Sequence, residues 1–196
     1  MTKIIEWNNL KSYRKYWQNK KSVLVGGCFD LFHYGHLRFL QQAKKQGKVL
    51  IAILESDEFI KKSKKRQPVH NQRQRAEILS SLTIVDFVIL IPYFSTNENY
   101  FNLVKNINPS IIAVTDGDRQ LINKKRQAEM IGSRVVVVSS LLPGFSSRKI
   151  IKTFNIYPSY SGLKPFRAKK RIRWADTEKT NYKPKFFLVY EIIFSD

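Results

Sequence analysis

Residues 22–47 read SVLVGGCFDLFHYGHLRFLQQAKKQG, and the order of residue types in this stretch indicates how the chain folds. Its β-branched start is typical of a strand buried on both faces, and its later leucines and alanine recur at helical spacing. Between them lie Gly26 and Gly27, which let a phosphate approach the backbone closely. The helix that follows begins near Gly35, where free N–H groups and the helix dipole attract anions. The stretch therefore predicts a strand, a glycine loop and a helix with an anion site at their junction.

Outward from this unit, short apolar runs alternate with segments of helical periodicity. Strands that are buried on both faces read as such continuous β-branched runs, and their alternation with helices is typical of an α/β domain with a parallel sheet and right-handed crossovers. The alternation predicts five strands, at 23–25, 49–54, 87–91, 111–114 and 134–139. It predicts helices around 37–43, 76–82, 100–107, 124–131 and 150–154.

The two ends of the chain differ from this pattern. Leu10, Tyr13 and Trp17 indicate an N-terminal helix within 1–21 that packs on the core of a domain spanning 1–157. Residues 158–196 form a basic C-terminal extension that contains RAKKRIRW and ends in a β-prone apolar segment. That segment would be an aggregation hazard if it stayed free, so we expect it to join a sheet edge or a subunit contact.

Composition excludes several classes of protein. The 196 residues are 43% hydrophobic and 13% aromatic, which excludes a disordered chain despite a net charge of +20. The single cysteine excludes a disulfide framework and a cysteine-based zinc site. No apolar run approaches the roughly 18 residues of a membrane span, and the first residues lack the features of a signal peptide. We therefore expect a soluble, cytoplasmic protein.

The charge is concentrated in blocks, since residues 58–75 and 119–157 carry +13 of the +20. Such blocks suggest local anion sites more than a uniformly basic surface. At the glycine loop, His33 and His36 are three residues apart, so both imidazoles can face the same phosphate. Two such histidines could also be surface or core residues, or a metal pair, but no third ligand stands nearby in sequence. Their position after a strand and two glycines favours phosphate binding.

The stretch GGCFDLFHYGH resembles the GxFDxxHxGH signature of the cytidylyltransferase-like nucleotidyltransferases. The resemblance covers about residues 8–155 and is most specific to the heptose 1-phosphate adenylyltransferases, including the nucleotidyltransferase half of bifunctional heptose enzymes. It implies a Rossmann-like, doubly wound sheet, the HxGH nucleotidyltransferase fold. The further motifs that carry it are ESDEFIKKSK (55–64), QRAEIL (74–79), VDFVILI (85–91), NPSIIAVTDGD (108–118) and PGFSSRKII (143–151).

This resemblance implies roles for the residues that would carry the reaction. His33 and His36 would hold the triphosphate and stabilise its charge during transfer. Lys64 would bridge the donor α-phosphate and the attacking phosphate, although a solvated basic run is the ordinary interpretation of its neighbours. Arg75 would lie near the substrate phosphate.

The resemblance also implies a nucleotide-binding set. Asp30 would order the first loop, and Asp118 would lie near the base and ribose. Ser146 and Ser147 would bind the β- and γ-phosphates, an interpretation compatible with the common role of serine as a helix cap. The remaining members are Gly26, Gly27, Cys28, Phe29 and Gly35, of which Cys28 is expected to be a small buried residue and not a nucleophile.

The implied activity is adenylyl transfer from ATP to a sugar phosphate similar to heptose 1-phosphate, with release of pyrophosphate and formation of an ADP-sugar. Mg²⁺ would be bound with the triphosphate, and no protein side chain is identified as its ligand. The alternatives are a CTP-dependent enzyme acting on glycerol 3-phosphate or a similar alcohol phosphate, and an inactive relative that binds nucleic acid through its basic tail. The resemblance also implies a possible homodimer.

Overall fold

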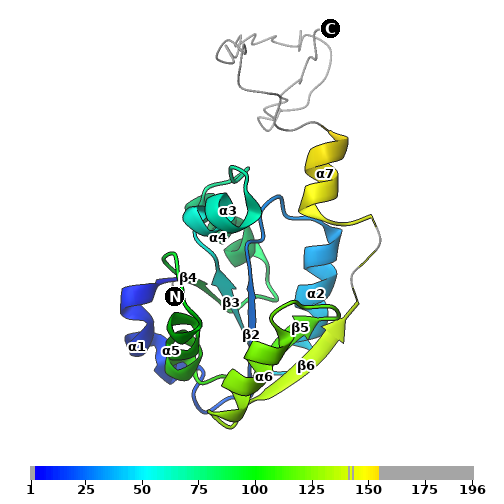
Figure 1. The fold of residues 1–196 in the computed structure, drawn as a ribbon. Coiled ribbons are helices and arrows are strands. Elements are labelled where there is room, and N and C mark those ends of the chain that lie inside the picture. Colours follow the sequence, from blue (N-terminus) through cyan, green and yellow to red (C-terminus); the bar gives the residue numbers. More distant parts are fainter. Residues whose placement is uncertain (1–2, 141, 143, 155–196) are drawn as a thin grey trace, which may run out of the picture. The chain divides into compact units, whose positions relative to one another are not determined.

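The continuous β-branched runs form five neighbouring strands of a parallel sheet in the computed structural model of this protein, which describes residues 3–140, 142 and 144–154 (Figure 1). The strand order is β1-β4-β3-β2-β5-β6. From the central β2 the chain winds outward through β3 and β4 on one side and through β5 and β6 on the other. The strands are β1 (Ile4–Glu6), β2 (Ser22–Gly27), β3 (Val49–Leu54), β4 (Phe87–Leu90), β5 (Ile111–Thr115) and β6 (Arg134–Ser139).

Helices cover both faces of this sheet, and alternate residues of each strand pack against opposite layers. Val23 and Val25 of β2 pack in one apolar cluster with Leu40, whereas Leu24 packs in the other with Trp17 and Ile107. The helices are α1 (Leu10–Tyr13), α2 (Tyr34–Lys44), α3 (Asp57–Lys64), α4 (Gln72–Ser81), α5 (Asn97–Ile107), α6 (Leu121–Glu129) and α7 (Ser147–Thr153), with short 3₁₀ turns at Trp7–Asn9 and Arg14–Tyr16.

The predicted α/β class with a doubly wound parallel sheet is confirmed, but the sheet in the described residues has six strands and not five. The sixth is β1, which pairs with β4 in the register Ile4 to Val88. Three residues are too few to show a period, and the partner strand lies more than 80 residues away. Sequence patterning therefore had no local signal for this strand.

The N-terminal segment also differs from the single helix expected within 1–21. It consists of β1, α1 and the two 3₁₀ turns. Its packing on the core is nevertheless as predicted, because Trp17 is fully buried and its indole Nε1 donates a hydrogen bond to the Ile107 carbonyl at 3.0 Å. The segment is held by burial of one large ring, a tertiary interaction.

A second unpredicted element is α3, directly after β3. The Ser56 hydroxyl caps it by accepting the Phe59 N–H at 3.1 Å, and Asp57 and Glu58 in the first turn favour the positive end of the helix. Only Ile60 of this helix is buried, so its apolar stripe is too short to show a helical period. The cap is therefore the sequence signal by which α3 could have been recognised.

The extension 158–196 lies outside the described residues, and its boundary and its β-prone end stay predictions. In the part of the chain that the structure describes, no helix is long and apolar enough to cross a membrane.

Candidate active site

Ligands of doubly wound sheets bind beyond the carboxyl ends of the strands, where the winding reverses. Here the winding reverses between β2 and β5. A cavity of about 290 Å³ opens at the ends of β2, β5 and β6. The structure brings most of the sequence-predicted residues to this cavity. It is lined by residues 26–29, His33, Gly35, His36, Asp118 and the serines Ser146 and Ser147.

Two histidines line the cavity at the start of α2. The rings of His33 and His36 are stacked, with their centroids 3.8 Å apart. His33 is the N-cap of α2, and its Nδ1 accepts the backbone N–H of His36 at 3.4 Å. A neutral imidazole that accepts at Nδ1 carries its proton on Nε2, so His33 keeps an N–H donor for a ligand.

Burial keeps both rings uncharged. It lowers the pKa of His33, and burial together with the neighbouring His33 lowers the pKa of His36 to about 3, opposed only by the charge of Asp30. The Nδ1 atom of His36 is also buried without a hydrogen-bond partner. Two neutral rings beside the free N–H groups of a helix start make a polar surface that can accept the charge of a phosphate.

Gly35 leaves the space that this arrangement requires. A Cβ atom at this position would lie 3.0 Å from Cε1 of His33 and 3.3 Å from the Phe145 carbonyl oxygen. Any side chain would therefore displace the His33 ring or the segment before α7. Close packing therefore favours glycine between the histidines.

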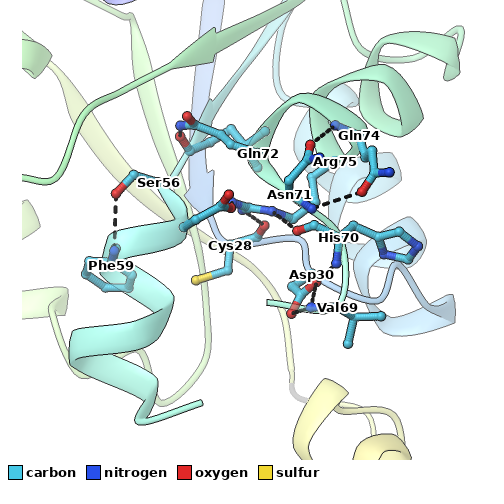
Figure 2. A network of polar contacts seen from close by, with 12 residues as sticks. Cys28, Asp30, Ser56, Phe59, Val69, His70, Asn71, Gln72, Gln74 and Arg75 are labelled. Atoms are coloured by element: carbon cyan, nitrogen blue, oxygen red, sulfur yellow. Dashed lines mark hydrogen bonds and ion pairs between the residues drawn. The ribbon is translucent and has the colours of Figure 1, made fainter. Parts of the chain in front are cut away.

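Asp30 holds the loop between β2 and α2 in a strained conformation. The residues on either side of it, Phe29 and Leu31, both have positive φ, at 46° and 53°. The Asp30 carboxylate accepts the N–H groups of Val69 and His70, each at 3.1 Å (Figure 2). It also pairs with Arg66. Burial alone would raise the pKa of Asp30, but these hydrogen bonds outweigh it and hold the pKa below its usual value. The expected role of Asp30 in ordering the loop fits this geometry.

Arg75, which the resemblance places near the substrate phosphate, is not among the residues that line the cavity. Its side chain is fully buried, and its guanidinium donates to the carbonyl oxygens of Cys28 and His70 and to Asp57 Oδ1, at 2.6, 3.1 and 2.6 Å (Figure 2). With these acceptors engaged and no exposed surface, the guanidinium reaches no substrate in this conformation. Its geometry is that of a scaffold that ties the glycine loop to α3 and α4.

Lys64 ends α3 outside the lining of the cavity but near it. Its ammonium acts electrostatically on the Cys28 thiol and on the Glu55 carboxyl, and the next residue, Lys65, terminates the helix in a left-handed conformation with φ of 54°. Burial raises the pKa of Cys28 to about 11 despite Lys64. Cys28 is therefore a protonated thiol near neutral pH, as expected for a residue that is not a nucleophile.

The lining of the cavity also contains an ion pair, of which the sequence predicted one member and not the other. Asp118 was predicted, and its carboxylate accepts from Lys124 Nζ at 2.7 Å. Lys124 also lines the cavity, but it was interpreted only as part of a helix. The position of Lys124, six residues after Asp118 and near the start of α6, is the sequence feature that could have indicated this ion pair.

The two serines are held by bonds within the protein. The Ser146 hydroxyl caps α7 by accepting the Lys149 N–H at 3.2 Å, and the Ser147 hydroxyl donates to the Asp30 carbonyl at 2.6 Å. Capping is thus one role of Ser146, as the alternative interpretation held. Through Ser147, the start of α7 is fastened to the strained loop that carries the histidines.

Glu55 is the second residue that sequence reasoning missed. It follows β3 directly, is 9% exposed, and accepts the Tyr100 hydroxyl on both carboxylate oxygens, at 3.1 and 3.2 Å. Burial raises its pKa to about 7, although the hydrogen bond from Tyr100 and the positive charges of Lys64, Arg75 and Lys124 oppose the rise. Near neutral pH this carboxyl is therefore only partly ionised.

This carboxyl has a consequence for stability. In the unfolded chain it titrates near its usual 4.5 and in the folded chain near 7, so the folded state binds more protons between these values. The free energy of unfolding should fall as the pH rises through that window. Glu55→Gln is expected to remove this fall and to stabilise the protein by about 2–3 kcal/mol at pH 8. Urea titrations of both proteins at pH 5 and pH 8 measure it, and an equal pH dependence would contradict it.

Within the described residues, no three His, Cys, Asp or Glu side chains gather in a way that would hold a metal ion.

Similarity to known proteins extends over most of the chain. The family model described as cytidylyltransferase-like matches residues 24–189. An FAD synthase of Pyrococcus horikoshii is 37% identical over 138 residues, which is 70% of this chain and 90% of that protein. The bifunctional protein HldE of Geobacter sulfurreducens is 33% identical over 138 residues, which is 69% of this chain but only 27% of that protein.

Solved structures show the same fold at lower identity. A lipopolysaccharide core biosynthesis protein from Thermoplasma volcanium has a TM-score of 0.52 and 22% identity, covering 63% of this chain and 98% of that one. Pantothenate synthetase from Thermus thermophilus has a TM-score of 0.57 and 16% identity, covering 81% of this chain and 68% of that one. At such identities the likeness concerns the fold alone.

Proposed function

The chain belongs to the cytidylyltransferase-like family of nucleotidyltransferases, and on that premise we propose that it transfers the adenylyl group of ATP to the phosphate of a small acceptor. The observation that supports this most is the convergence on one cavity of the His33–His36 pair, the start of α2 and the Asp118–Lys124 pair. These are neutral or cationic hydrogen-bond donors with one carboxylate already paired. The cavity suits an anion with a sugar and base attached.

The proposed reaction is an in-line displacement. An oxygen of the acceptor phosphate attacks the α-phosphorus of ATP and forms a new P–O bond, while the bond to the bridging oxygen breaks and pyrophosphate leaves. A phosphate oxygen is already ionised near neutral pH, so the reaction needs no general base. The protein must instead place donors where negative charge increases, and this usually supplies the largest share of catalysis.

His33 Nε2–H and the neutral His36 ring are proposed to contact the triphosphate, and Lys64 to contact both reacting phosphates. Lys64 suits that role because it reaches the edge of the site from α3, on the side of Cys28 and Glu55. Positioning of both reactants contributes further, up to about 7–11 kcal/mol in favourable cases. Mg²⁺ is proposed to be held by triphosphate oxygens and water, where it would neutralise charge.

For the acceptor, the relatives suggest two chemistries. The FAD synthases are matched over most of their length, and formation of FAD requires adenylyl transfer to FMN. Partly exposed aromatic rings beyond the carboxyl ends of β1 and β4 and on α5 would suit such a planar acceptor: Phe94 contacts both Trp7 and Tyr100 edge to face, with centroids 5.5 and 5.4 Å apart. We propose FMN as the first acceptor and a heptose 1-phosphate-like sugar phosphate as the second.

A pyrophosphate-release assay tests nucleotide and acceptor together. The full chain is mixed with Mg²⁺, with ATP or CTP, and in turn with FMN, a panel of sugar 1-phosphates and glycerol 3-phosphate. We expect turnover with ATP and FMN at least tenfold faster, by about 1.4 kcal/mol in transition-state free energy, than with CTP or with any other acceptor. Turnover with CTP but not with ATP would contradict the proposed nucleotide. Turnover with a sugar phosphate but not FMN would restore the acceptor expected from the sequence.

A further inference from the structure

Glu55 contacts both the glycine loop, where the triphosphate is proposed to bind, and Tyr100, one of the aromatic rings proposed for the acceptor. Its backbone N–H donates to the Gly27 carbonyl at 3.1 Å, so it sits beside the glycine loop that lines the cavity. Its side chain is nearly buried, and among the described residues the Tyr100 hydroxyl is the one hydrogen-bond donor to its carboxylate. No cation of the described residues forms an ion pair with it. A buried carboxyl held by a single neutral donor is unusual, because buried carboxylates are normally paired.

The charges that face Glu55 come from every element around it. Lys64 of α3, Arg75 of α4 and Lys124 of α6 act on the carboxyl electrostatically, and the Cys28 thiol is its neighbour after β2. Two of these cations are occupied elsewhere, since Arg75 pairs with Asp57 and Lys124 with Asp118. Burial raises the pKa of the Glu55 carboxyl to about 7, and these cations offset that rise only in part.

We infer that Glu55 couples substrate binding to protonation: its carboxyl takes up a proton from water when a triphosphate enters the cavity and returns it when the phosphates leave. The inference rests on the proposed function, because it requires a polyanion beside the glycine loop. The proposed transfer reaction itself uses neither Glu55 nor this proton.

The physical reason is repulsion in a poorly hydrated place. A triphosphate brings several negative charges, which Mg²⁺ neutralises only in part, to a cavity whose lining includes Cys28 and Lys124, both of which interact with Glu55. An ionised carboxyl there opposes binding, whereas a neutral one does not and can also donate a hydrogen bond. By linkage, a ligand that favours the protonated form takes up protons as it binds and binds more weakly as the pH rises.

Calorimetric titration of the full chain with MgATP, without acceptor, tests the inference. At pH 8, the enthalpy measured in buffers of different ionisation enthalpy gives the number of protons taken up. We expect the unaltered protein to take up about 0.5–1 proton more than Glu55→Gln. Protons taken up by His33 and His36 cancel in this difference, because both proteins retain the histidines.

Affinity gives a second measurement. Between pH 7 and pH 8.5, the Kd for MgATP of the unaltered protein should rise about three- to tenfold relative to that of Glu55→Gln. Tyr100→Phe should shift this rise to higher pH, because it removes the hydrogen bond that stabilises the carboxylate. Tyr13→Phe is the matched control, since the described ring contact of Tyr13 is with Tyr16 and it makes no described interaction with Glu55 or Tyr100, and its profile should be that of the unaltered protein.

The outcomes separate this inference from the proposed function. Equal proton uptake by the unaltered protein and Glu55→Gln, with ATP bound by both, overturns the inference and leaves the proposed function standing. No binding of ATP by either protein overturns the proposed function, and the inference with it. Should Glu55→Gln fail to fold, Tyr100→Phe decides, and an unshifted pH profile of that variant counts against the inference.

Discussion

Replacing His36 by alanine is expected to lower kcat by about 10³-fold, the usual effect of removing a donor to developing charge. The reason lies in its position: the ring is stacked on His33 at the start of α2 and is neutral because burial lowers its pKa to about 3. Alanine removes the ring and also the support that keeps His33 in place. Pyrophosphate release with saturating ATP measures the effect.

His70 provides the matched control for this variant. It is the third histidine of the chain, and the bonds it makes to Asp30 and Arg75 use its backbone, which alanine retains. His70→Ala should stay within about threefold of the unaltered kcat. Since His36 also packs against Phe29 and Phe32, thermal unfolding must show that His36→Ala is folded at the assay temperature. A folded His36→Ala protein with a near-normal rate would refute the proposed site.

Replacing Lys64 by alanine is expected to lower kcat by about 10²–10³-fold while changing the Kd for ATP by less than about threefold. The proposed role explains the difference, because a charge that bridges both reacting phosphates acts most strongly in the transition state. The structure supports this position through α3, whose Ser56 cap and buried Ile60 fix the helix that ends at Lys64. Steady-state rates and equilibrium binding of ATP separate the two effects.

Lys61 is the matched control, since it lies on the same helix and is exposed. Lys61→Ala removes the same charge from the same basic run, and its kcat should change by less than about threefold. Equal losses in the two variants would show that the basic run acts only through its overall field. The ordinary interpretation of Lys64, a solvated surface lysine, would then hold.

Much of the architecture was predictable because its signals are local. The run VLIAIL at 49–54 forms β3 with the predicted bounds, and RVVVVS at 134–139 forms β6. Continuous apolar residues of that length indicate strands without reference to the rest of the chain. The expected burial on both faces holds for β3 but not for β6, which is an edge strand with half-buried and exposed residues. β1 could not be predicted in this way, because its three residues are held by pairing with β4 and by burial of Ile5, which are both tertiary interactions.

The residues of the site likewise fall into those with a local sequence signal and those placed by tertiary contacts. The glycines and histidines that line the cavity lie within residues 26–36, and their spacing alone placed them at one helix start. Arg75 shows the limit of a motif, because matching a pattern did not reveal that its guanidinium is enclosed by acceptors from three segments.

The sequence by itself determined the α/β class, the alternation of strands and helices along the chain and the position of the glycine loop before the start of α2, since each depends on residues that are neighbours in the chain. Only the tertiary structure decided that Glu55 is buried against Tyr100, that Lys124 pairs with Asp118 and that Arg75 is a scaffold. Burial and charge pairing depend on which distant segments meet. A residue's position in the chain does not reveal its distance from water or from another charge, and these two distances decide its chemistry.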